Sequence, residues 1–116
     1  MTAVDIDTFL HTQVACWNAG DKDGFFAAYR IAATGGLTVE YVGRPAADGW
    51  AVLEQMWARQ SGAVRIEMVQ SIVNGREAAC HHRNHVQARG AAIETIELYR
   101  FDEDGALAVR YFIAPS

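Results

Sequence analysis

Two adjacent segments of the chain carry chemically useful polar groups at every second position. We predict two strands, Glu77–Ala88 and Ala92–Phe101, that fold back on each other at Arg89-Gly90. The side chains of an extended strand alternate between its two faces. One face of the pair therefore collects Cys80, His82, Asn84 and Val86 from the first strand, and Ile93, Thr95, Glu97 and Tyr99 from the second. Such a mixture is unusual in a structural core and typical of a partly apolar ligand cavity.

Glu97 and His82 are the candidate catalytic groups on this face. An inward Glu97 loses water, which favours the neutral carboxyl and lets it act as an acid or a hydrogen-bond donor. If Arg110 points inward and pairs with Glu97, the carboxylate instead stays ionised and becomes an acceptor or a base. His82 is the inward group that titrates near neutrality without perturbation. Each residue also has a purely structural interpretation. Glu97 could be an ordinary solvated strand residue, and His82 could be a core histidine that is hydrogen-bonded to Asn84 or Glu97.

The run from His81 to His85 invites a metal-site hypothesis, which strand geometry argues against. On a helix, His81 and His85 would share one face. On a strand they lie about 13 Å apart, at roughly 3.3 Å per residue, and His82 points the other way. Zinc, with Zn–N distances of about 2.1 Å, cannot be held by such a set. We therefore expect neither a metal site nor a cofactor.

Composition and charge narrow the possible classes of protein. The 116 residues are 51% hydrophobic and 21% charged, which is typical of one globular domain spanning residues 1–116. The net charge is −4 and the basic residues are scattered, which argues against nucleic-acid binding. The N-terminus has no apolar signal segment, and no apolar run is long enough for a membrane helix. Two cysteines make no disulfide framework, so we expect a cytoplasmic protein.

The apolar spacing and the turn residues predict an α+β domain. Asn74-Gly75 is a strong two-residue hairpin signal. Helices gathered on one face of a curved antiparallel sheet are the expected architecture. The predicted elements are helices over Asp5–Asn18, after Asp21 or Asp23, and from Asp48 to Gln60, with strands over Leu37–Val42, Val64–Val73, Glu77–Ala88, Ala92–Phe101 and Leu107–Ile113.

Several short stretches, in this order and spacing, resemble the NTF2-like superfamily, which includes ketosteroid isomerases and SnoaL-type polyketide cyclases. The resemblance spans nearly the whole chain. It implies a cystatin-like cone, in which a curved antiparallel sheet carries three helices on its concave face. The stretches include Trp17-Asn18-Ala19-Gly20-Asp21, Leu37-Thr38-Val39-Glu40, Leu53-Glu54-Gln55-Met56-Trp57 and Ile96-Glu97-Leu98-Tyr99-Arg100-Phe101.

The resemblance also implies roles for individual residues. Glu97 matches the acidic residue that donates an oxyanion hydrogen bond in the isomerases. The family's oxyanion tyrosine falls at Gln13, whose amide can still donate. The catalytic base falls at Tyr41, a poor base near neutrality. An insertion around Ile31–Gly35 leaves open that Glu40 is the inward residue. The family's apolar pocket positions match His82, Asn84 and Val86, so the pocket is expected to be more polar than a steroid site.

Further residues are candidates for contact with a ligand. Trp17, Met56 and Trp57 belong to helical apolar stripes, and we expect one or two of these large side chains to line the cavity as well as the core. Tyr99 shares the inward parity of Glu97. Arg110 completes the candidate set, although the preceding turn leaves its direction open.

The opposite sheet face mixes apolar and hydrogen-bonding groups, which suits a subunit interface better than a solvated surface. We expect a homodimer that pairs these outer faces, with His81, Arg83, His85, Ile96 and Leu98 at or near the contact.

Two functions from different classes fit these features. The first is a cofactor-independent isomerase, cyclase or dehydratase that acts on a small hydrophobic carbonyl compound. In it, His82 or Glu40 moves a proton while Glu97 and Gln13 stabilise an oxyanion. The second is a non-catalytic module that binds a small molecule or dimerises. The phenol at Tyr41 favours the second function, and the grouping of His82, Asn84 and Glu97 favours the first.

Overall fold

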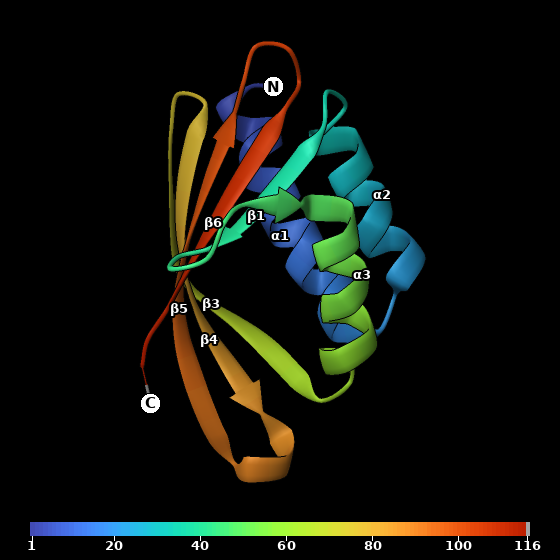
Figure 1. The fold of residues 1–116 in the computed structure, drawn as a ribbon, viewed down its shortest axis with the longest axis vertical. Helices are drawn as coiled ribbons and strands as arrows, with labels where there is room; N and C mark the ends of the chain where they lie inside the picture. Colours follow the sequence, from blue (N-terminus) through green and yellow to red (C-terminus); the bar gives the residue numbers. More distant parts are fainter. Residues whose placement is uncertain (116) are drawn as a thin grey trace.

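A computed structural model describes residues 1–115 of the chain. Three helices lie on one side of a strongly curved six-stranded sheet (Figure 1). The elements are α1 (Ala3–Ala19), α2 (Lys22–Ala32), β1 (Leu37–Tyr41), β2 (Ala47–Asp48), α3 (Gly49–Gln60), β3 (Val64–Asn74), β4 (Glu77–Val86), the 3₁₀ turn η1 (Gln87–Arg89), β5 (Ala91–Phe101) and β6 (Leu107–Ile113).

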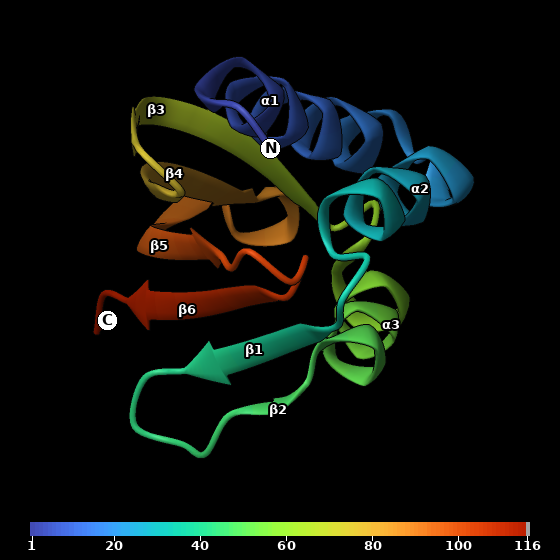
Figure 2. The ribbon, with the colours of Figure 1, turned by 90° about the horizontal axis from the view of Figure 1, so that it is seen from above.

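The sheet has the strand order β2-β1-β6-β5-β4-β3. Its neighbouring strands run antiparallel except β1 and β6, which run parallel. The curvature brings β3 under α1, while β1 and β2 reach toward α3 (Figure 2). The expected α+β cone with three helices on the concave face is therefore confirmed, with one parallel pairing that the sequence did not reveal.

Local signals set the ends of the helices. Thr2 caps α1 in a reciprocal capping box with Asp5, so this helix begins two residues before its predicted start. Gly20 ends it in the left-handed conformation, with a φ of 71°. Asp21 caps α2 and Asp48 caps α3, both through side-chain bonds to backbone N–H groups. None of the helices within residues 1–115 is long and apolar enough to cross a membrane.

A bulge in β3 changes which of its side chains face the helices. Strand parity places Ile72 on the inner face with Ile66 and Met68, but the register shifts between Met68 and Gln70. A bulge inserts one extra residue and reverses the parity beyond it. Ile72 consequently lies on the outer face and is 60% exposed, while Val73 packs against the core.

The opposite end of the β4–β5 hairpin also departs from the prediction. We predicted a strand as far as Ala88, but β4 ends at Val86 because Gln87–Arg89 forms a 3₁₀ turn. Gly90 then takes the left-handed conformation, with a φ of 61°, that a side chain would disfavour. This turn carries Arg89, which is exposed.

Two contacts fix the helices that carry cavity residues. Asn18 clamps the backbone of Ile66, donating to its carbonyl and accepting from its N–H, both at 2.8 Å. This clamp ties the end of α1 to the edge strand β3. At the start of α3, Gly49 packs on Leu37 so closely that a Cβ at this position would collide with the leucine side chain. α3 is thereby held against β1.

Candidate ligand cavity and acid–base site

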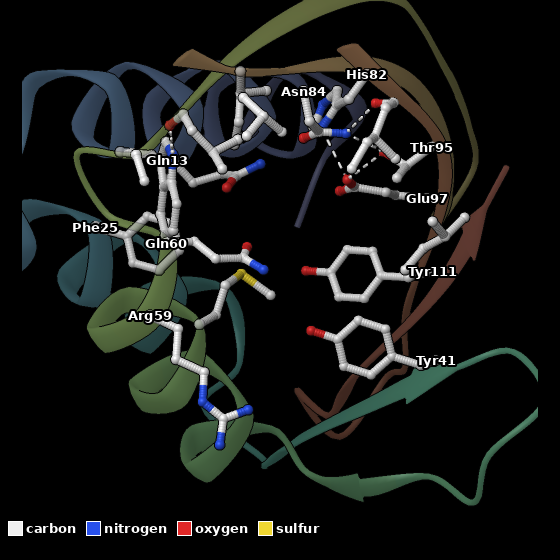
Figure 3. Close-up of a pocket in the computed structure, with 18 of the residues that line it drawn as sticks. Gln13, Phe25, Tyr41, Arg59, Gln60, His82, Asn84, Thr95, Glu97 and Tyr111 are labelled. Atoms are coloured by element: carbon white, nitrogen blue, oxygen red, sulfur yellow. Dashed lines mark hydrogen bonds and ion pairs between the residues drawn. The ribbon is translucent and has the colours of Figure 1, made fainter. Parts of the chain in front are cut away.

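A cavity of about 380 Å³ lies between the concave face of the sheet and the helices (Figure 3). Its volume is near the lower end of the range for small-molecule sites. Eight of the predicted site residues line it: Gln13, Trp17, Tyr41, Met56, His82, Asn84, Val86 and Glu97. The parity argument for the β4 and β5 pair is thus confirmed, since its polar side chains face one space.

Glu97 is held at the closed end of the cavity by hydroxyl donors. The Tyr99 hydroxyl donates to Glu97 Oε1 at 2.6 Å, and the Thr95 hydroxyl donates to Oε2 at 3.3 Å. Asn84 Nδ2 in turn donates to the Thr95 oxygen at 3.1 Å, which directs the Thr95 proton toward the carboxyl group. Glu97 is only 7% exposed, so its direction is set by these contacts and not by solvent. In this arrangement both oxygens of Glu97 accept hydrogen bonds.

His82 lies directly beside this carboxyl group. Its Nδ1 is 2.9 Å from Glu97 Oε2, close enough for an ion pair. The separation alone suggests a hydrogen bond, but the direction of the ring N–H does not meet the oxygen. Neither ring nitrogen therefore has a hydrogen-bond partner among residues 1–115. His82 is 1% exposed, and an unsatisfied buried polar group costs about 1–3 kcal/mol. His82 is therefore a buried titratable group in close contact with Glu97, and its ring nitrogens can still form a hydrogen bond with a ligand.

All four tyrosines of the chain lie in the cavity lining or directly beside it. Tyr29, Tyr41 and Tyr111 line the cavity, and Tyr99 bonds Glu97. The hydroxyls of Tyr41 and Tyr111 point into the open space (Figure 3), and their rings pack with centroids 5.4 Å apart. Burial raises the pKa of each of the four phenols, and the Glu97 charge acts in the same direction. They therefore stay protonated near neutrality and serve as hydrogen-bond donors.

Four predicted site residues do not line the cavity. Glu40 and Arg110 sit on the outer sheet face and pair with each other, with Arg110 Nε 3.3 Å from Glu40 Oε1. The proposed inward position of Glu40 and the pair between Arg110 and Glu97 are therefore both wrong. Strand parity explains this, because Tyr41 and Tyr111 take the inward positions next to them. Trp57 is partly buried and packs edge-on against Trp17 at the edge of the core. Tyr99 is fully buried and bonds Glu97 without lining the cavity.

The structure adds cavity residues that the sequence reasoning missed. Tyr111, which is paired across the strands with Glu97, is one of them. Thr95, paired with His82, was already placed on this face by strand parity. The alternation of Leu107, Val109 and Tyr111 along β6 was a usable signal, because all three are buried. The missed lining residues at the mouth are Arg59, Gln60 and Arg89.

The outer face of the sheet carries a network of ion pairs. Glu94 accepts from Arg83 Nε at 3.0 Å and lies 2.7 Å from His81 Nε2. His85 Nε2 lies 2.8 Å from Glu67. Hydrogen bonds from His81 and Arg83 lower the pKa of Glu94, and the bond from His85 lowers that of Glu67. Exposed apolar side chains surround this network: Val69, Ile72, Ile96 and Phe112.

Comparison with known proteins identifies the fold. The chain matches no protein-family model and no curated protein by sequence. It is similar in structure to a cystatin-like protein of unknown function from Methylobium petroleophilum PM1, with a TM-score of 0.78 and 16% identity over 100% of this chain and 80% of that one. An NTF2-like protein of unknown function from Burkholderia xenovorans LB400 gives a TM-score of 0.74 and 12% identity, over 97% of this chain and 84% of that one.

A third similar structure is an NTF2-like protein of unknown function from Cytophaga hutchinsonii ATCC 33406. It gives a TM-score of 0.69 and 12% identity, over 99% of this chain and 92% of that one. Identities this low establish a shared fold and nothing more. The chain therefore has the cystatin-like, NTF2-like fold that its sequence resembles, and a function must be argued from the cavity itself.

Proposed function

We propose that the protein binds a small, largely apolar carbonyl compound in the cavity and moves a proton on it. It would then be a cofactor-independent isomerase, cyclase or dehydratase. The observation that carries this proposal is the buried Glu97 carboxyl group, fixed by Tyr99 and Thr95 at the closed end of the cavity and facing His82. Titratable groups held together in a cleft are a signature of acid–base sites.

Glu97 is the proton acceptor in this proposal. Both of its oxygens already accept hydrogen bonds, so it is arranged as a carboxylate. It takes a proton from the carbon next to the carbonyl, and the C–H electron pair moves onto the carbonyl oxygen. His82 lies beside the carboxyl group, with its Nδ1 2.9 Å from Oε2. If the substrate is conjugated, returning the proton to the far carbon of the dienolate completes an isomerisation. If it carries a β-hydroxyl group, that group leaves with the proton from Glu97 as water, which completes a dehydration.

Tyr111 and Tyr41 are the proposed donors to the developing oxyanion. Their hydroxyls point into the cavity, and burial keeps both protonated. Gln13, which is buried to 3% exposure on α1, adds an amide donor to the same space. Donors fixed in a dry site stabilise a developing negative charge without having to reorganise.

Proton exchange into a simple ketone tests this function. We expect the protein to accelerate deuterium uptake from D₂O at the carbons next to the carbonyl of 2-tetralone, measured by ¹H NMR. Exchange at the rate of protein-free buffer, for 2-tetralone and for a panel of monocyclic and bicyclic ketones, would contradict the proposal.

A non-catalytic binding module is the second candidate function. It is favoured by Tyr41, which occupies the cavity position where the resemblance places a carboxylate base. Such a module would bind apolar molecules in the cavity and leave the exchange rate unchanged. The same exchange measurement, combined with a binding assay, separates the two functions.

We further propose that two copies of the chain pair through their outer sheet faces. The ion-pair network there contains both signs of charge, so it can complement a second copy of itself across a two-fold axis. Exposed Ile96 and Phe112 supply apolar area beside it.

Sedimentation at micromolar concentration tests this pairing. The expected mass is twice the 12.7 kDa of one chain, and Ile96→Glu should yield monomer because it buries a charge in the contact. Ile31→Glu, at a 74% exposed position on α2, is the matched control and should leave the dimer intact. A wild-type monomer under these conditions would argue against the pairing.

A further inference from the structure

Two arginines line the mouth of the cavity at the end opposite Glu97. Arg59 comes from the last turn of α3 and Arg89 from η1 (Figure 3 shows Arg59). A backbone bond from the Gln87 N–H to the Ala63 carbonyl, at 3.1 Å, joins η1 to the segment that follows α3. Two segments distant in sequence thus each contribute an exposed arginine to the lining of one cavity.

Neither arginine forms an ion pair with another residue in the described part of the chain. The arginines that form ion pairs within residues 1–115 are Arg83, Arg100 and Arg110, and all of them lie away from the cavity. Arg59 and Arg89 are both exposed and form no ion pair with a carboxylate among these residues. Two unpaired cations at the entrance of one cavity are therefore free to bind an anion.

The charge of the mouth is opposite to that of the whole chain. The protein carries 14 acidic and 10 basic residues, yet the cavity lining holds two arginines and one carboxylate, Glu97, which lies at the closed end. The positive charge of Arg59 acts on a residue of the cavity lining. Burial raises the pKa of Tyr41, and the charges of Arg44 and Arg59 oppose that rise. A local positive potential at a cleft attracts and orients anions.

We infer that the ligand of this cavity is an organic acid, bound with its carboxylate between Arg59 and Arg89 and its reacting end at Glu97. This inference rests on the proposed function, because it assigns a substrate class to the same cavity. The opposite orientation is disfavoured, since a carboxylate at the closed end would face Glu97. Guanidinium groups suit this role because their planar fork matches a carboxylate. The cavity of about 380 Å³ limits the apolar body to a short chain or one or two rings.

Displacement of a neutral fluorescent probe tests the inference. N-phenyl-1-naphthylamine reports occupation of the cavity, and it is displaced by naphthalene-2-carboxylate or by 2-naphthamide, which has nearly the same shape without the charge. We expect the wild type to prefer the carboxylate by about tenfold at low salt, with the preference shrinking as salt is added. Arg59→Gln and Arg89→Gln should each reduce this preference about threefold and leave amide binding unchanged.

Two controls separate failure of the inference from failure of the proposed function. Arg65→Gln removes the same charge from β3 outside the cavity lining and should keep the full preference. Val86→Trp fills the cavity and should abolish binding of the neutral probe. Equal displacement by acid and amide, unchanged by either mouth substitution, overturns the inference alone. Failure of the neutral probe to bind, or binding that survives Val86→Trp, overturns the cavity as a ligand site and the inference with it.

Discussion

Glu97→Gln is expected to reduce the rate of deuterium exchange into 2-tetralone by about 10²–10⁴-fold, the usual contribution of a general base. Glutamine retains the size of the side chain and a carbonyl oxygen that can accept from Tyr99, but it cannot take up a proton. Binding of N-phenyl-1-naphthylamine should change little, because the cavity keeps its shape. ¹H NMR of the ketone in D₂O and fluorescence titration measure the two quantities on one preparation.

Glu94→Gln is the matched control for this experiment. Glu94 lies on the same strand as Glu97 but on the outer face, where it bonds His81 and Arg83. Its substitution should leave exchange at the wild-type rate. A loss of less than about tenfold in Glu97→Gln would instead indicate that Glu97 donates a hydrogen bond to an oxyanion, and the assignment of the base would then be wrong.

Raising the pH from 8 to 11 is expected to lower the free energy of unfolding by an amount on the order of 5 kcal/mol. Burial raises the pKa values of Tyr29, Tyr99 and Tyr111 well above the ordinary value for tyrosine. Burial also raises the pKa of the Cys80 thiol to about 12. In the unfolded chain these groups lose protons near pH 10 for tyrosine and 8.5 for cysteine. The stability from keeping them neutral is therefore complete below those values and is lost as the pH rises beyond them.

Urea denaturation at a series of pH values measures this loss. Tyr99→Phe removes one of the buried phenols, so the stability of this variant should fall less steeply above pH 10, by roughly 1 kcal/mol per pH unit. Tyr41→Phe removes the least buried of the four phenols and should alter the slope less. A denaturation midpoint that stays constant between pH 8 and 11 would contradict the buried, protonated tyrosine cluster.

The fold was predictable because its signals are local and agree with one another. Asp21 and Asp48 cap the helices as expected. The predicted hairpin between β3 and β4 forms, but its two turn residues are Gly75 and Arg76, one position beyond the predicted Asn74-Gly75, because Asn74 still pairs with Glu77. Period-two alternation along β4 and β5 correctly placed His82 and Glu97 on one face. The sequence therefore predicts the orientation of a side chain correctly where that orientation depends only on neighbouring residues in the chain.

The remaining features depend on contacts between distant segments. The bulge after Met68 reverses the parity of β3, and nothing in that run of residues marks it. The direction of Arg110 depends on the register of β6, which the preceding turn does not fix. The mouth of the cavity needs the end of α3 and η1 to meet, so Arg59 and Arg89 could not be associated from the sequence. The shape of the cavity could not be predicted either, because it depends on how the sheet and the helices pack together.

Methyl NMR on selectively labelled methionine offers the most direct test that the cavity is the ligand site. The chain has three methionines, Met1, Met56 and Met68, and only Met56 lines the cavity. Titration of [¹³C-methyl]methionine protein with naphthalene-2-carboxylate is predicted to shift the Met56 resonance, through the ring current of the bound naphthalene, and to leave those of Met1 and Met68 in place. A Met56 signal that stays fixed at saturating ligand, or one that moves no more than the other two, would contradict the account.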